Sequence, residues 1–110
     1  MGSVTVEAIK IKLSKHIREY WRNLPWDGID INTVNDLDQV SPILNDNFRY
    51  EGQGEYDFSA DISFMVKEVH NPYGSHREQY RIFPFCKISI KELYNDFTIE
   101  ITSSIMLQRR

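Results

Sequence analysis

The stretch from Glu55 to Val69 alternates apolar and polar residues over almost its whole length. Every even-numbered position from 56 to 66 is apolar, whereas Met65 is the only apolar residue at the odd-numbered positions from 55 to 67. A period of two places successive side chains on opposite faces of a strand. Because a strand buried on both faces is apolar throughout, this pattern predicts an antiparallel sheet with one covered face and one wet face.

A second segment with the same phase follows a strong turn signal. Residues 71–74 read Asn-Pro-Tyr-Gly, an order typical of a β-turn. Beyond the turn, the even-numbered positions are again apolar at Tyr80, Ile82, Cys86, Ile88 and Ile90. A hairpin centred near Tyr73 brings the two apolar faces together. The pairs that it predicts are Val66 with Tyr80, Phe64 with Ile82 and Phe58 with Ile88.

Two features shape the rest of the predicted sheet. Pro84 lies inside the second segment and removes one backbone donor, which predicts a bulge or an unpaired edge there. A third segment, from Phe97 to Leu107, has apolar residues at its odd-numbered positions and is broken only at Ser103. The three segments predict a meander of antiparallel strands.

Residues 4–24 predict an N-terminal helix. Apolar residues recur there at spacings of three and four, at Val6, Ile9, Leu13, Ile17, Tyr20 and Leu24. Thr5 is a suitable N-cap, and Pro25 forces the residue before it out of the helical region. Short alternations between residues 4 and 13 leave open that a strand begins here instead.

The segment 25–47 has no clear period. We expect a turn at 26–28 and a short helix over about 33–40, capped by Asn32. Its cluster of Asp and Asn residues suggests a calcium loop, but the EF-hand spacing, with its central glycine and final glutamate, is missing. Residues 47–51 then form either a short strand of a hairpin or the start of one long bent strand that continues past Gly54.

These elements predict a single α+β domain over residues 1–110, with the N-terminal helix packed on one face of a three- to four-stranded antiparallel meander sheet. The net charge is −3, and residues 27–61 carry nine acidic residues against one basic residue. Such an acidic balance argues against nucleic-acid binding. The single cysteine predicts a reducing, cytoplasmic location, and the absence of a long apolar run argues against a membrane span.

The sequence contains no motif that assigns a reaction. It lacks a phosphate-binding glycine loop, a zinc-type cysteine pair and a nucleophile elbow. His70, His76 and Cys86 are the soft metal ligands that we considered for a common site, and they do not make a structural zinc site. We therefore expect no catalytic residue, no cofactor and no metal.

One group of residues departs from the alternation and predicts a binding surface. Met65, Phe83, Phe85 and Met106 all fall on the face of the sheet that should be wet. Methionine and phenylalanine are enriched at the centres of protein interfaces. These four residues predict docking of a protein partner or a homodimer, unless residues 25–47 fold over them.

A second hypothesis places function on the opposite side of the sheet. A helix on a curved sheet can enclose a pocket, and this one would be lined by Trp21, Trp26, Tyr50 and Tyr56. That arrangement predicts a small-ligand-binding domain or an enzyme. Large aromatic residues at a helix–sheet boundary are also common core residues, so the two interpretations remain open.

The run from Glu51 to Ser63 resembles a β-rich accessory module of bacterial proteins that is found beside PIN-type ribonuclease domains. The likeness consists of a strand punctuated by Gly52 and Gly54, followed by further amphipathic strands, and it covers roughly half the chain. It implies a bacterial, non-catalytic companion module, since the nuclease acids have no counterpart here. The order of helix then meander is also similar to cystatin-type folds, which implies a fold and no function.

Overall fold

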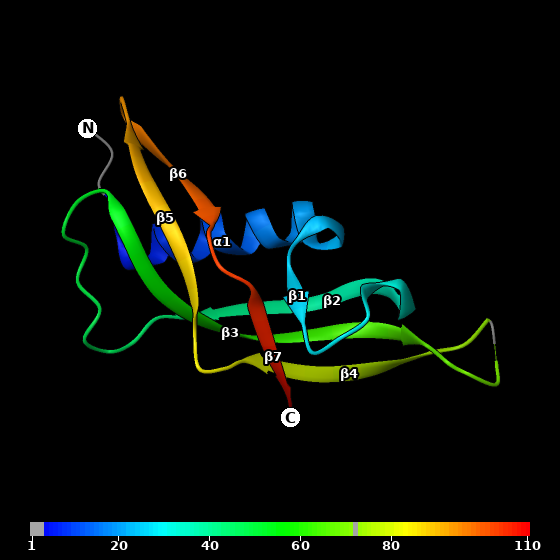
Figure 1. The fold of residues 1–110 in the computed structure, drawn as a ribbon. Coiled ribbons are helices and arrows are strands. Elements are labelled where there is room, and N and C mark those ends of the chain that lie inside the picture. The colour runs from blue at the N-terminus through cyan, green and yellow to red at the C-terminus, as the bar shows by residue number, and fades with distance from the viewer. Residues whose placement is uncertain (1–3, 72) are drawn as a thin grey trace.

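The long alternating segment forms β3 (Gly54–Lys67), the strand with which three others pair. The computed structural model describes residues 4–71 and 73–110, and within them it is an α+β fold with one N-terminal helix and a mixed sheet of seven strands (Figure 1). The other elements are α1 (Val6–Tyr20), β1 (Trp26–Asp27), β2 (Val34–Ile43), β4 (Ser75–Ile82), β5 (Cys86–Leu93), β6 (Asp96–Ile101) and β7 (Ile105–Arg109), with short 3-10 turns at Trp21–Asn23 and Ile31–Thr33.

The pairing along β3 changes halfway. Its residues 59–66 pair with β2 and its residues 61–67 pair with β4, so these two strands lie on opposite edges of β3. Its first five residues, 54–58, pair with β5. The strand order is β1-β7-β4-β3-β5-β6, and only β1 joins its neighbour in the parallel sense among the described pairs.

The prediction of three to four strands is too low because two predicted strands are each broken in the middle and because β1 and β2 were not predicted as strands. The segment after the hairpin divides into β4 and β5 at Phe83–Phe85, where the Phe83–Pro84 peptide bond is cis. The last segment divides into β6 and β7 at residues 102–104. The two breaks face each other, since Phe83 donates its backbone N–H to the Met106 carbonyl at 2.9 Å. The sheet bends along this line.

The predicted helix over 33–40 is wrong, because these residues belong to β2. Val34, Leu37 and Val40 are buried at a spacing of three, which resembles a helical period. In the structure that spacing arises from two register shifts in the pairing of β2 with β3. Each irregularity changes which side chain faces the core, so the strand loses its period of two.

The predicted hairpin is present, but its register differs. Tyr80 lies opposite Ile62 instead of Val66, and Phe58 lies opposite Cys86 instead of Ile88. Pairing of Lys67 with Ser75 centres the turn nearer residue 71. The shifts are even in number, so the same faces remain buried. Pro72, in the predicted turn, lies outside the described residues.

The loop before β3 resolves the two alternatives for residues 47–51. No strand is assigned there, and β3 begins at Gly54. The aromatic rings of Phe48 and Tyr50 instead pack on Tyr56, with ring centroids 5.3 and 5.6 Å away. Their even-numbered spacing therefore reflects a loop folded back onto the strand.

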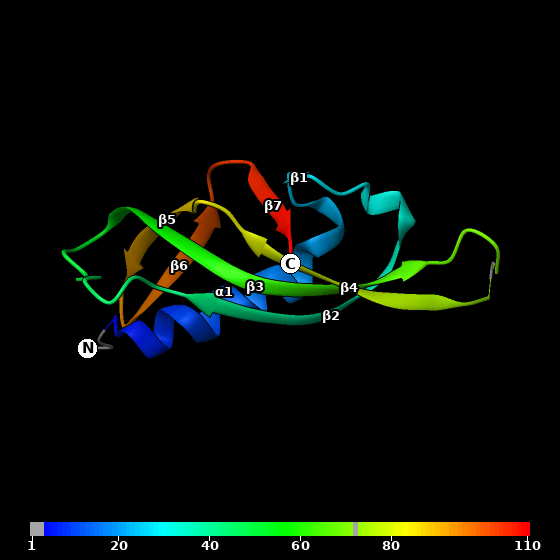
Figure 2. The same cartoon turned by 90° about the horizontal axis from the view of Figure 1, so that it is seen from below.

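The helix follows the prediction closely. The Thr5 hydroxyl accepts a hydrogen bond from the Ala8 backbone N–H at 3.0 Å and so caps α1. One stripe of α1, comprising Ile9, Leu13 and Ile17, is fully buried against the sheet. Figures 1 and 2 show α1 along one face of the sheet, with the tip of the β3–β4 hairpin projecting beyond the helix. The helix contacts both β2 and β6.

Candidate partner-binding surface

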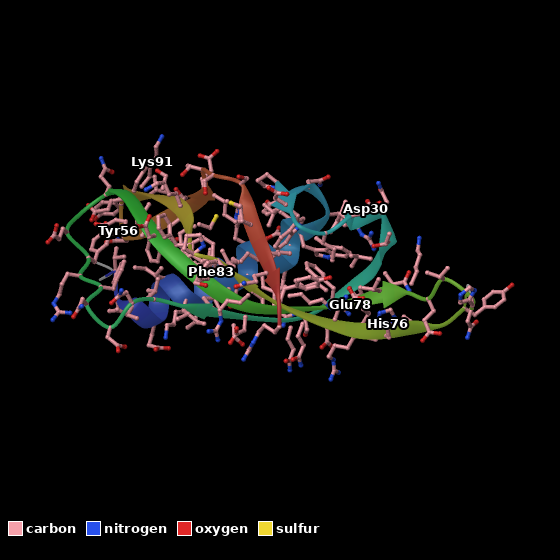
Figure 3. The ribbon with its side chains drawn as sticks, turned by 60° about the horizontal axis from the view of Figure 1, so that its bottom comes forward. Asp30, Tyr56, His76, Glu78, Phe83 and Lys91 are labelled. Carbon is pink, nitrogen blue, oxygen red and sulfur yellow. The ribbon has the colours of Figure 1, made fainter. Side chains whose placement is uncertain are left out.

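Three of the four residues predicted to bind a partner gather where the sheet bends. Phe83, Phe85 and Met106 are 56%, 44% and 50% exposed. They follow or precede residues whose side chains fill the core, so the pleat turns them to the face opposite α1. Figure 3 labels Phe83 beside β3, near the middle of the sheet.

A hollow of about 440 Å³ adjoins Phe85. Ile43 at the end of β2 forms one wall, and Pro84 with Phe85 forms another. Ile43 pairs with Ser59 of β3, which places it on the same face as Phe85. We call Ile43, Phe83, Phe85 and Met106 the bend patch. Ile43 is absent from the predicted group because the sequence pattern does not show that β2 is a strand.

Met65 does not join the bend patch. It lies opposite Asp36 of β2 and Arg77 of β4 and is partly buried. Six residues of extended chain separate it from Ser59, or roughly 20 Å at the usual rise of a strand. Parity predicts the face of the sheet on which Met65 lies. It does not predict the distance between Met65 and the bend patch, because parity alone does not define a position along the strand.

Residues 25–47 leave the bend patch uncovered. β2 continues the sheet beside β3, and β1 pairs with the edge of β7. Asp27 of β1 pairs with Met106 at one border of the patch, and Ile43 and Asn45 line the hollow at another. The segment therefore extends the patch and does not bury it.

The four residues of the predicted ligand cleft fall into two separate groups. Trp21 and Trp26 pack against Phe64, and the Trp26 indole donates a hydrogen bond to the Trp21 carbonyl at 2.6 Å. Tyr50 stacks on Tyr56 near the start of β3. Phe64 and Tyr56 are eight residues apart along one strand, roughly 26 Å. The structure does not bring the four side chains into one pocket.

Tyr50 makes a charged contact at that end of the sheet. Its hydroxyl donates a hydrogen bond to Glu92 Oε1 at 2.6 Å. Partial burial, together with this bond to a carboxylate, raises the pKa of Tyr50 to about 12. The phenol therefore stays protonated at neutral pH and tethers the loop to β5.

A polar network borders the apolar core on β4, where Glu78 lies opposite Phe64. The Glu78 carboxylate accepts a hydrogen bond from the Tyr80 hydroxyl at 2.6 Å, lies 2.8 Å from His76 Nε2 and forms an ion pair with Arg109 at 3.3 Å. These contacts, that of Tyr80 first, lower the pKa of Glu78. A carboxylate with three partners is a weak proton acceptor, so the network is better suited to tying β4 to β7 than to acid–base catalysis.

The lowered pKa of Glu78 predicts a loss of stability in acid. A carboxyl group whose pKa is lowered by folding stabilises the folded state at pH values above its ordinary pKa, which is near 4.5 here. This contribution is lost as the pH falls through the folded-state pKa. We expect Glu78→Gln to reduce the free energy of unfolding by about 1 kcal/mol at pH 7. The difference from wild type should shrink towards pH 3. Urea titrations across this range measure it, with Glu51→Gln on the loop before β3 as control. A difference that grows in acid would contradict the assignment.

Metal and thiol chemistry find no support in the described residues. No group of three His, Cys, Asp or Glu side chains within residues 4–71 and 73–110 is arranged to hold a metal ion. Cys86 is fully buried, and burial raises the pKa of its thiol, which makes it a poor nucleophile. The described part of the chain also contains no helix long and apolar enough to cross a membrane.

The bend patch is thus the feature of this chain best suited to a function. It combines exposed apolar side chains, an adjoining hollow and a position on a rigid sheet. Comparison of the chain with protein-family models, curated proteins and solved structures finds no match.

Proposed function

We propose that this chain is a non-enzymatic interaction module that binds a protein through the bend patch. The observation that carries the proposal is the exposure of Phe83, Phe85 and Met106 together on a face where the alternation of β3 calls for polar residues. Large aromatic and methionine side chains are enriched at the centres of protein interfaces. An exposed cluster of this kind is unfavourable in water unless a partner covers it.

Charged groups around the bend patch fit the same function. Lys87 lies 5.5 Å from the centre of the Phe85 ring and 3.2 Å from Asp57. On the other side, Arg81 forms two hydrogen bonds to Asp61, at 2.8 and 3.1 Å, which lower the pKa of that carboxyl. An apolar centre with a rim of both charge signs is the usual anatomy of a protein interface.

The setting of the module is part of the proposal. The resemblance of residues 51–63 to the accessory module beside PIN-type ribonuclease domains supports a bacterial companion role. The buried thiol of Cys86 is compatible with a cytoplasmic location. The bound protein is either a different chain or a second copy of this one, and the following experiment distinguishes them.

The test compares the wild type with Phe83→Asp/Phe85→Asp. The matched control is Tyr73→Asp/Tyr94→Asp, which makes the same kind of change at two almost fully exposed aromatic residues outside the patch. Size-exclusion chromatography with light scattering measures self-association, and a pull-down from a lysate of the source organism, followed by binding measurements with the purified protein that it captures, measures binding to another chain. Urea unfolding confirms that all three proteins fold.

We expect the patch variant to lose at least about tenfold in affinity for the partner, or to shift from dimer to monomer, while the control behaves as wild type. Equal binding by all three proteins would overturn the proposal. Failure of the patch variant alone to fold would show that these rings belong to the core; the single change Met106→Asp, at a half-exposed residue, then tests the surface by itself.

A further inference from the structure

The outer edge of the sheet is formed by β6 and β7, and only one half of it is covered. Along β7, the segment around β1 lies against the edge: Trp26 pairs with Ile105, and Ile105 donates its N–H to the Pro25 carbonyl at 2.8 Å. Along β6, the only strand paired in the described structure is β5. The molecule thus adds an extended segment to one half of this edge and leaves the other half open.

The hydrogen-bond pattern identifies which backbone groups of β6 are available. Thr102 donates its N–H to Lys87 across the pair with β5. In an antiparallel ladder such residues alternate with residues whose backbone groups point away. Ile99 and Ile101 are therefore directed to the open edge. Phe97 confirms the alternation, since its carbonyl also points away from β5 and accepts a hydrogen bond from the Lys12 ammonium group.

A groove between α1 and β6 adjoins these backbone groups. Its volume is about 450 Å³, and we call it the α1–β6 groove. Ile11 and Tyr20 on the flank of α1 are 66% and 47% exposed, whereas Phe97 and Ile99 form a buried apolar floor. Side chains of a strand added to β6 alternate between this groove and the opposite face, so half of them would contact Ile11 and Tyr20.

The charges around the groove define its occupant. Lys12, Lys15 and Glu19 line the helix side with a net charge of +1, which favours acidic or apolar side chains there. His16 also lies on this side, and burial lowers its pKa. Glu100 projects from the face of β6 opposite the groove, and a basic side chain of the added strand is favoured beside it. A second copy of this chain fits poorly: when Ile99 and Ile101 of two copies bond to each other, Glu100 lies opposite the Glu100 of the second copy. Directly opposed like charges destabilise a strand pair.

We propose that β6 binds an extended segment of another protein by strand addition. The added segment lies along the same edge of the sheet as β1. The segment carries apolar and acidic side chains towards α1 and a basic side chain beside Glu100. Main-chain hydrogen bonds to Ile99 and Ile101 supply the register, and the groove selects the side chains, as in other peptide complexes formed by β-augmentation. This surface is separate from the bend patch, so either proposal can fail without the other.

The first test is amide hydrogen exchange of the isolated protein, measured by NMR. The N–H groups of Ile99 and Ile101 should exchange quickly, and those of Thr98 and Glu100, which face β5, should be protected. Protection of Ile99 and Ile101 that increases with protein concentration would show pairing between copies and would overturn the proposal.

The second test adds a capped nine-residue peptide whose successive side chains would alternate between the two faces of the sheet. Val and Asp would face the groove, and Thr and Lys would face the opposite side. Titrated to roughly 1 mM, which reveals even weak binding, the peptide should slow exchange at Ile99 and Ile101. N-methylation of the alternate peptide amides that face β6 should abolish this protection, whereas methylation of the other set should leave it intact. No protection at any concentration, or equal loss with both methylated peptides, would overturn the proposal.

Charge reversal on the helix provides the protein-side control. Lys15→Glu should weaken binding of the peptide about fivefold, because it replaces an attraction to the acidic row with a repulsion. Arg18→Glu makes the same change on α1 at an exposed residue outside the groove and should bind as wild type. Equal weakening by the two variants would mean that only net charge matters and would overturn the proposed groove. Phe83→Asp/Phe85→Asp should bind the peptide normally.

Discussion

Replacing Phe64 with alanine is expected to reduce the free energy of unfolding by about 4 kcal/mol. Phe64 is fully buried on the helix side of β3. Its ring packs against Trp26 in an edge-on geometry at 5.2 Å and lies 6.2 Å from Trp21 and 6.1 Å from Tyr80. One side chain therefore joins the end of α1, the start of β1 and the centre of the sheet, and these rigid rings cannot collapse into the space left by its removal.

Urea unfolding measures this loss, and Met65→Ala is the matched control. Met65 is the next residue on the same strand, but it faces the other side of the sheet and is only partly buried. We expect that change to cost about 1 kcal/mol, since the side chain is not fully removed from water in the folded protein. An unchanged m-value in both variants would show that the unfolded state is unaffected. Similar losses for the two variants would contradict the placement of the core on one face.

The second large effect is expected at Gly28, directly after β1. Its φ is +97°, and a Cβ atom there would lie 2.6 Å from the Leu107 carbonyl oxygen of β7. Alanine therefore meets both a left-handed backbone and a collision with another backbone, which cannot move as a flexible side chain can. We expect Gly28→Ala to cost about 3 kcal/mol and to displace β1 from β7.

Gly52→Ala isolates the collision from the backbone strain. Gly52 has nearly the same φ, +96°, but a Cβ atom added there would meet nothing within 4 Å. Its substitution should cost only the conformational strain, about 1–2 kcal/mol. Hydrogen exchange at the Ile105 N–H, which bonds to Pro25, should accelerate more in Gly28→Ala than in Gly52→Ala. Equal costs and equal exchange rates would show that β1 is not held against β7.

These variants also connect stability to the open sheet edge. β1 covers the β7 half of the edge, so its displacement extends the unpaired strand that begins at β6. Long unpaired edges promote pairing between molecules. Gly28→Ala should therefore aggregate more readily than Phe83→Asp/Phe85→Asp, whose edge remains intact.

Alternation and capping along the chain were sufficient to predict several features. The period of two located β3 and its buried face, and the helical period with the Thr5 cap located α1. Parity also placed Phe83, Phe85 and Met106 on the face away from the helix. These are local properties, because the direction of each side chain follows from its neighbours in the same strand or helix.

Other features depend on partners that are distant in the sequence. The sequence predicts a helix where the structure has β2, because register shifts against β3 remove the period of two that identifies a strand. The breaks near Pro84 and Ser103 became visible only as one bend across paired strands. Tyr80 was placed opposite the wrong residue of β3 for the same reason.

The candidate surface shows the same division. Alternation along each strand is enough to predict which side chains turn away from the core, since one residue along a strand reverses the direction. The folded structure is needed to show that Ile43 joins the bend patch, that Met65 lies apart from it, and that β6 keeps an open edge while β7 is covered. Those outcomes rest on hydrogen bonds between strands, whose register is set jointly by both strands of the pair and by the packing of α1 against them.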